Sequence, residues 1–313
     1  MRKIPTVLGE IEDNVLGVTL FHEHVACVNP CFYNAFGEKW FPREKVIERA
    51  VKLFKQAKEE CGVSTIIDGT PIDLGRDIEM IKEVSLRSGV NILVSSGIYH
   101  NEEAFLHGKR PEKLAKFFIE ECQRGIENTN VRPALLKCAT GRLRVTEINE
   151  ILLTAMAITQ KETGLPLYCH NEHEVKTAYA QLSVFEKHGV DMSKVVIGHC
   201  SDCYDIEYLT DLLKKGCYLG FDRIYPSAYE KQAETISELI AKGYEDKLLV
   251  SHDYAAFLDF GDTYFEMQEL DNRDFTTVHK KLFPALKGMG ITNNQIQKLA
   301  VDNPRKVLSG ECS

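Results

Sequence analysis

Apolar runs that favour β-strands alternate with helical patterns along the chain, and the alternation repeats eight times. The runs are rich in valine, isoleucine, leucine and aromatic residues, as strands that are buried on both faces usually are. The predicted strands are 18–25, 65–69, 91–99, 133–139, 165–170, 195–199, 217–222 and 248–253.

Between these strands, apolar residues recur at three- and four-residue spacing, which is the pattern of a helix with one buried face. Several of these stretches are followed by glycine, a residue that commonly ends a helix, as at Gly62, Gly89 and Gly164. The predicted helices are 43–61, 78–88, 111–128, 147–163, 174–188, 206–215 and 229–242, and two closing helices are predicted over 276–288 and 293–308.

Eight β-α units over about 250 residues are typical of an α/β protein of the (β/α)8 TIM barrel type. A doubly wound open sheet is the alternative, but the glycine-rich phosphate turn that should follow its first strand is missing. We find no linker and no low-complexity segment. We therefore expect one domain, 1–313, with its active site at the C-terminal ends of the strands.

Side chains that can bind a metal or be modified stand at the ends of five of these apolar runs. His22 and His24 share one face of a strand, so their imidazoles can chelate one divalent cation. Such a pair alone is more often structural, but four further residues hold equivalent positions. They are Lys137, His170, His199 and Asp253. Burying all of these groups unpaired would be costly, so we predict a metal centre.

The charge balance and the cysteine content narrow the function classes further. A formal net charge of −8 disfavours a nucleic-acid-binding protein, which would carry a basic patch. No apolar run approaches the roughly 20 residues of a transmembrane helix, and the N-terminal residues do not resemble a signal peptide. The 10 cysteines are too sparse for a disulfide scaffold. We expect a cytoplasmic protein with neither a nucleic-acid nor a membrane partner.

These residues and the motifs around them resemble the phosphotriesterase family of the amidohydrolase superfamily, and within it the phosphotriesterase-like lactonases. The resemblance runs nearly from one end of the chain to the other. Its motifs are 6–9, 16–24, 69–70, 74–77, 97–99, 198–199, 220–223, 251–254 and 302–304.

The resemblance implies a binuclear centre for two divalent transition metals, with zinc expected and Co²⁺ or Mn²⁺ as alternatives. His22, His24 and Asp253 would bind the more buried cation, and His170 and His199 the more exposed one. The two cations would share a hydroxide that acts as the nucleophile, and Asp253 would accept its proton.

The resemblance also gives Lys137 and two loop residues a role. Lys137 would bridge both cations after reacting with carbon dioxide, because a lysine ammonium has no lone pair to donate whereas a carbamate has two oxygens. Tyr99 would lie near the metals and the substrate, and Arg223 would shape the leaving-group side. His100, like the other histidines outside the strand ends, is expected at the surface.

Basic residues near the later loops suggest how a charged substrate could be held. A cluster formed by Lys231, Lys242 and Arg273 would bind a phosphate or carboxylate group of a small substrate. The alternative is that these are ordinary solvated surface charges.

Three functions remain open. The first is a lactonase that opens a small or phosphorylated sugar γ-lactone, with side activity on phosphotriesters. The second is a related hydrolase of an amide or a phosphate ester, and the third is a barrel that binds a ligand without catalysis. The complete ligand set favours an enzyme. The segment 224–227 is short, and 255–262 lacks the tryptophan that is usual in the acyl-homoserine lactonases of the branch that the chain resembles. Both departures disfavour a long-chain homoserine lactone. We expect a small-molecule substrate and a homodimer.

Overall fold

Parallel strands form a ring in the computed structural model, which describes residues 2–259 and 274–310. Each strand pairs with the next one along the chain, from β3 to β10. The strands are β3 (Val18–Cys27), β4 (Val63–Asp68), β5 (Asn91–Gly97), β6 (Leu135–Ala139), β7 (Leu167–His170), β8 (Val195–Ile197), β9 (Tyr218–Phe221), β10 (Leu248–Val250) and β11 (Ala255–Leu258).

The last two strands are two pieces of one strand position, and they close the ring. β10 pairs with β9, whereas β11 pairs with β3. In the break between them, the amide of Ser251 donates to the carbonyl of Phe221 at 3.1 Å, and the amide of Asp253 donates to the carbonyl of His22 at 3.1 Å. The chain is therefore a (β/α)8 TIM barrel, as the alternation of elements predicts.

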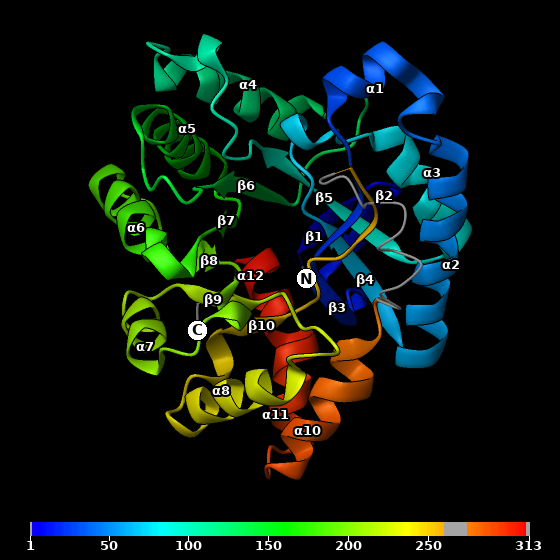
Figure 1. Ribbon diagram of the computed structural model, residues 1–313, viewed down its shortest axis with the longest axis vertical. Coiled ribbons are helices and arrows are strands. Elements are labelled where there is room, and N and C mark those ends of the chain that lie inside the picture. The colour runs from blue at the N-terminus through cyan, green and yellow to red at the C-terminus, as the bar shows by residue number, and fades with distance from the viewer. Residues whose placement is uncertain (1, 260–273, 311–313) are drawn as a thin grey trace.

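Helices surround the strand ring on its outer side (Figure 1). The helices are α1 (Pro30–Phe36), α2 (Arg43–Cys61), α3 (Ile78–Ser88), α4 (Pro111–Arg124), α5 (Glu147–Thr163), α6 (Thr177–His188), α7 (Ile206–Lys214), α8 (Tyr229–Ala241), α10 (Phe283–Gly288), α11 (Asn293–Gln297) and α12 (Asn303–Ser309). The apolar faces of most of them pack against the outward side chains of the strands in two large clusters, whereas α12 contributes Val307 and Leu308 to the cluster inside the ring. Gly62, Gly89 and Gly164 follow their helices in the left-handed conformation, as expected of helix-ending glycines.

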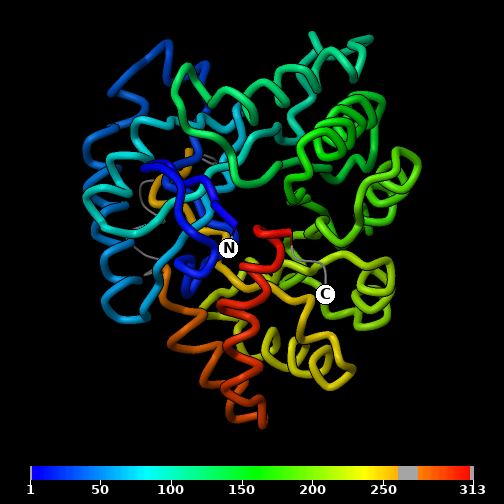
Figure 2. Tube along the Cα trace, turned by 180° about the vertical axis from the view of Figure 1, so that it is seen from behind, coloured from blue at the N-terminus to red at the C-terminus, as the bar shows by residue number. Residues whose placement is uncertain are grey.

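The inside of the ring is filled by side chains rather than left as a channel. One residue from each strand position contributes to this cluster, including Phe21, Leu93 and Tyr168. An N-terminal antiparallel pair, β1 (Lys3–Thr6) and β2 (Gly9–Glu12), adds Ile4 to it and lies beside α12 near the centre of the ring (Figure 2). The polar residues at the C-terminal ends of the strands thus lie next to this apolar cluster inside the ring.

The structure adds features that the sequence pattern does not predict. These are the β1–β2 pair, α1, and the break between β10 and β11. The closing helices are also less regular than predicted, since π-helical turns occupy Val278–Leu282 and Lys298–Asp302. Among the described residues, no helix combines the length and apolarity needed to cross a membrane. The single domain stays a prediction.

Candidate metal centre

A bulge in β3 sets the direction of the first two histidines. The ladder between β3 and β4 advances three residues on β3, from Leu20 to Glu23, against two residues on β4. An extra residue of this kind changes the phase of the side chains that follow it. Phe21 can therefore pack inside the barrel while His22 and His24 also face inward at the strand end.

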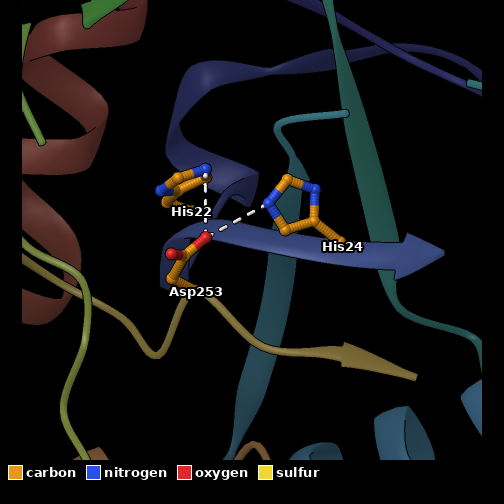
Figure 3. A group of neighbouring side chains, drawn as sticks. All are labelled: His22, His24 and Asp253. Atoms are coloured by element: carbon orange, nitrogen blue, oxygen red, sulfur yellow. Dashed lines mark hydrogen bonds and ion pairs between the residues drawn. The ribbon is translucent and has the colours of Figure 1, made fainter. Parts of the chain in front are cut away.

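Nitrogen atoms from four histidines converge at the C-terminal ends of the strands. The Nε2 atoms of His22 and His24 lie 3.6 and 3.2 Å from Oδ1 of Asp253 (Figure 3). On the other side of the ring, Nδ1 of His170 lies 2.5 Å from Nε2 of His199. All four imidazoles are buried. The barrel thus brings together residues from its first, fifth, sixth and eighth strands.

Lys137 points into the same group from β6. Its Nζ lies 2.7 Å from Nε2 of His22 and 4.4 Å from the centre of the Tyr168 ring. The side chain is almost completely buried. All six residues predicted as metal ligands therefore lie in one cluster.

The second nitrogen of each histidine is held by an oxygen, which fixes the ring and its tautomer. The contacts are His22 Nδ1 to Asp222 Oδ2 at 2.7 Å, His199 Nδ1 to Asp222 Oδ1 at 3.1 Å, His24 Nδ1 to Thr70 Oγ1 at 2.8 Å, and His170 Nε2 to Glu172 Oε1 at 3.3 Å. With those nitrogens donating, the inward nitrogens keep their lone pairs. This is the donor set that divalent transition metals prefer.

The spacing of the donors also fits bound cations. Ligand atoms of His22, His24 and Asp253 lie within 4.8 Å of one another, whereas the similarly spaced group of His22, His199 and Asp222 is the hydrogen-bonded set just described. The facing nitrogens of His170 and His199 offer a second position, and the His199 ring lies 5.6 Å from the His22 ring, so two cation positions would be adjacent. The residues present therefore fit a metal centre.

Burial keeps most of these ligands in the protonation state that binds metal. Desolvation, followed by the nearby Lys137, lowers the pKa of His22 to about 3. Desolvation likewise lowers the pKa of His170 and the pKa of Lys137. Burial alone would raise the pKa of Asp253, but His22 and His199 hold it well below its usual range. His22 and His170 are thus held as neutral nitrogens beside an anion, whereas the pKa of His24, which burial alone would lower, is raised well above its usual range by Cys27 and Asp253.

Comparisons with known proteins identify the family of the chain. Residues 2–308 match the model of the phosphotriesterase family. The chain belongs to this family. It is 33% identical to the phosphotriesterase homology protein of Mycobacterium tuberculosis over 98% of both chains, and 31% identical to an aryldialkylphosphatase of Saccharolobus solfataricus over 98% of this chain and 100% of that one.

A solved structure of the phosphotriesterase from Mycobacterium tuberculosis has the same fold, with a TM-score of 0.92 at 32% identity over 98% of both chains. An N-acetyltaurine hydrolase of Danio rerio is 25% identical over 98% of both chains. As a member of the phosphotriesterase family, the chain is a hydrolase.

Two further residues expected at the phosphotriesterase-family site lie in it. The hydroxyl of Tyr99 is 3.2 Å from Nδ1 of His170. Arg223 donates from Nε to Oδ2 of Asp253 at 2.9 Å and from Nη1 to Oδ2 of Asp202 at 2.9 Å. The guanidinium is therefore fixed between two carboxylates and cannot turn away from the metal ligands without breaking both ion pairs.

Two of the three basic residues are described by the structure, and they lie at opposite ends of α8. Lys242 follows the C-terminal end of α8, where it pairs with Glu238 at 3.5 Å. A barrel helix ends beside the N-terminal end of the next strand, so Lys242 lies at the end of the barrel opposite the metal ligands, and its predicted substrate contact is wrong. Lys231 lies 4.0 Å over the ring of Tyr204. Arg273 lies outside the described residues.

The most important residue that the sequence analysis overlooked is Asp222. Its carboxylate accepts from both His22 and His199, from the amide of His199, and from the hydroxyl of Tyr168. A signal was present, because strand alternation puts position 222 on the same face as Tyr218 and Gly220. His100, expected at the surface, is half-buried: its ring centre lies 4.1 Å from that of Tyr99, and burial lowers its pKa.

Two glycines make room for the tyrosine that reaches Asp222. A Cβ atom at Gly198 would lie 2.6 Å from the Tyr168 ring and hydroxyl, and one at Gly220 would lie 2.8 Å from the hydroxyl. Glycine at both positions lets Tyr168 cross the inside of the ring beneath the metal ligands.

Proposed function

We propose that this phosphotriesterase-family hydrolase is a binuclear metal enzyme that opens a small γ-lactone. The observation that carries the proposal is the convergence of four lone-pair nitrogens, the Asp253 carboxylate and Lys137 on one buried position. Two divalent cations bound there would supply both an electrophile for a carbonyl oxygen and a nucleophilic hydroxide near neutral pH.

Lys137 would bridge the cations as a carbamate. Burial favours the neutral amine, whose lone pair attacks carbon dioxide: the N–C bond forms, one C=O electron pair moves to oxygen, and one proton leaves to solvent. The product is an anion whose two oxygens can each face one cation. The contact at 2.7 Å between Nζ and His22 supports this placement.

Asp253 would accept the proton of the nucleophile, and Arg223 would hold the Asp253 carboxylate in position. Oδ1 of Asp253 faces His22 and His24, so it can accept that proton, while Oδ2 is held by Arg223. The Tyr99 hydroxyl, beside His170, is placed to donate to an oxygen of the substrate. These residues would orient a planar ester carbonyl toward the nucleophile.

The choice of a lactone rests on two observations. The first is the resemblance to the lactonase branch. The second is the short connection between β9 and α8, which offers little apolar surface for contact with a long acyl chain. With Lys242 at the other end of the barrel, Lys231 and Arg273 remain as the basic residues that would hold an anionic substituent on the lactone. The second candidate is an amide hydrolase, which the similarity to N-acetyltaurine hydrolases supports.

The purified protein is expected to hold about two transition-metal ions per chain, with zinc foremost. Elemental analysis after reconstitution with bicarbonate measures the content. Chelation should also lower the unfolding temperature, because a ligand that binds only the folded state stabilises it. A content well below one ion after reconstitution would contradict the binuclear proposal.

A five-membered lactone is expected to be hydrolysed with at least about tenfold higher kcat/KM than paraoxon, because a planar carbonyl needs less room than a phosphorus centre with three substituents. The comparison should include plain γ-lactones, acyl-homoserine lactones, sugar lactones with and without phosphate, and N-acyl amino acids. If paraoxon exceeds every lactone, the lactonase proposal fails. If an N-acyl substrate is best, the amide hydrolase replaces it.

A further inference from the structure

Glu172 holds the outward nitrogen of His170 from the solvent side of the metal-ligand cluster. It stands two residues beyond His170, just past β7, and its Oε1 lies 3.3 Å from Nε2 of that histidine. The carboxylate is partly accessible, with 20% of the side chain exposed, whereas His170 is buried. It therefore lies at the boundary between the metal ligands and solvent.

The ring geometry determines which nitrogen of His170 must carry the proton. Nδ1 faces His199 Nε2 at 2.5 Å and the Tyr99 hydroxyl at 3.2 Å, so it is the nitrogen directed at the cation position. A lone pair on Nδ1 requires the proton on Nε2, and that proton points to Glu172. The carboxylate thus selects the tautomer that can bind a metal.

The backbone around Glu172 keeps the carboxylate in place. The amide of Glu172 donates to Oγ1 of Thr177 at 2.8 Å, and the amide of Thr177 donates to the Glu172 carbonyl at 3.2 Å. On the solvent side, Nε of Arg142 lies 3.6 Å from Oε2. One carboxylate oxygen is therefore left to the histidine while the other faces a cationic side chain.

This support differs from that of the other three histidines. His22 and His199 share the fully buried Asp222, and His24 contacts the buried Thr70. Only His170, among these four, is supported from the solvent side. We propose that Glu172 is a positioning residue that fixes His170 for the second, outer cation and sets the affinity of that cation separately from the first. This inference rests on the binuclear site proposed above.

The test measures cation binding directly. Apo full-length protein in bicarbonate buffer is titrated with Co²⁺ in competition with a chelator, and the visible absorption of the bound Co²⁺ is recorded. Glu172→Ala is expected to weaken the second Co²⁺ by about 10- to 100-fold, to change the absorption of that site, and to leave the first Co²⁺ unchanged. Glu172→Gln keeps a hydrogen-bond acceptor, so it should restore the affinity to within about threefold of wild type.

Glu174→Ala is the matched control. Glu174 also lies 3.6 Å from Arg142, but it is 59% exposed and its ion pair does not involve the histidine. Its loss should leave both affinities unchanged, and all apo variants should unfold within about 2 °C of wild type. Equal affinities in Glu172→Ala and wild type would overturn the inference.

Two other outcomes are also decisive. If Glu172→Gln binds as weakly as Glu172→Ala, the carboxylate acts by charge alone, and the positioning role is overturned. If wild type itself binds fewer than two Co²⁺, the proposed function fails rather than this inference alone.

Discussion

Replacing Lys137 with alanine is expected to lower kcat/KM by about 1,000-fold or more and to lower the bound metal well below two ions per chain. The side chain is buried against His22, and Lys137 is the one lysine among the six predicted ligand residues, so none of the other five can form a carbamate in its place. A loss of this size corresponds to about 4 kcal/mol of transition-state stabilisation, which is the scale expected when two cations lose a shared ligand. Elemental analysis and steady-state kinetics measure the two effects.

The control separates the missing bridge from the missing volume. Lys137→Met fills the same space without a nitrogen, so it should be as inactive as the alanine variant. Acetate or propionate added together with metal should restore part of both metal content and activity to Lys137→Ala, because a short carboxylate can take the place of the carbamate. Full activity of the alanine variant without added acid would show that the bridge is assigned to the wrong residue.

Removing the Asp222 carboxylate is expected to lower the free energy of unfolding by about 3–5 kcal/mol and to abolish tight metal binding. Asp222→Ala leaves several buried donors without an acceptor: those of the His22 ring, the His199 ring and amide, and the Tyr168 hydroxyl. The two histidines also lose the contact that fixes their tautomers. Urea denaturation of chelator-treated protein separates the stability effect from the metal effect.

Asp246→Ala is the comparison for this stability effect. Asp246 pairs with Lys298 and Lys306 at 3.0 Å each, but its side chain is 43% exposed. Surface pairs of this kind contribute little, so the loss should stay below about 1 kcal/mol. A loss as small as this in Asp222→Ala would show that the buried hydrogen bonds do not support the site.

Most of the fold can be predicted from the sequence, because each β-α unit of the barrel is formed by residues that are close together in the chain. Helices 43–61, 78–88 and 147–163 are confirmed to the residue, since capping glycines and one apolar face define them. Helix 111–128 ends at Arg124 in the structure, because Gly125 stops it earlier than the apolar pattern does. The capped start of α1 at Asn29-Pro30 could have been recognised, since asparagine before proline is a common helix start.

The features that could not be predicted from the sequence depend on contacts between residues that are far apart along the chain. The β3 bulge is defined only by its ladder with β4, and the left-handed backbone of Asp253 lies in a break whose two sides pair with different strands. The bridging role of Asp222 needs His22 and His199 to meet across the barrel. The position of Lys242, in contrast, follows from the sequence pattern. Lys242 is the last residue of the predicted helix 229–242, and a barrel helix ends at the side of the barrel opposite the active site.

The break in the eighth strand, between β10 and β11, has a consequence for the order in which the parts of the barrel fold. The seam where β3 meets β10 and β11 joins residues far apart in sequence; the Glu23 carboxylate, for example, accepts from the amides of His252 and Tyr254, 229 and 231 positions away. Contacts over such separations carry the largest loop-closure entropy, so we expect this seam to form late in folding. Asp253 reaches His22 and His24 only when the seam is shut. A cation bound by these three residues would then retard reopening of the ring without nucleating its folding, and its stabilising effect would appear in the unfolding rate.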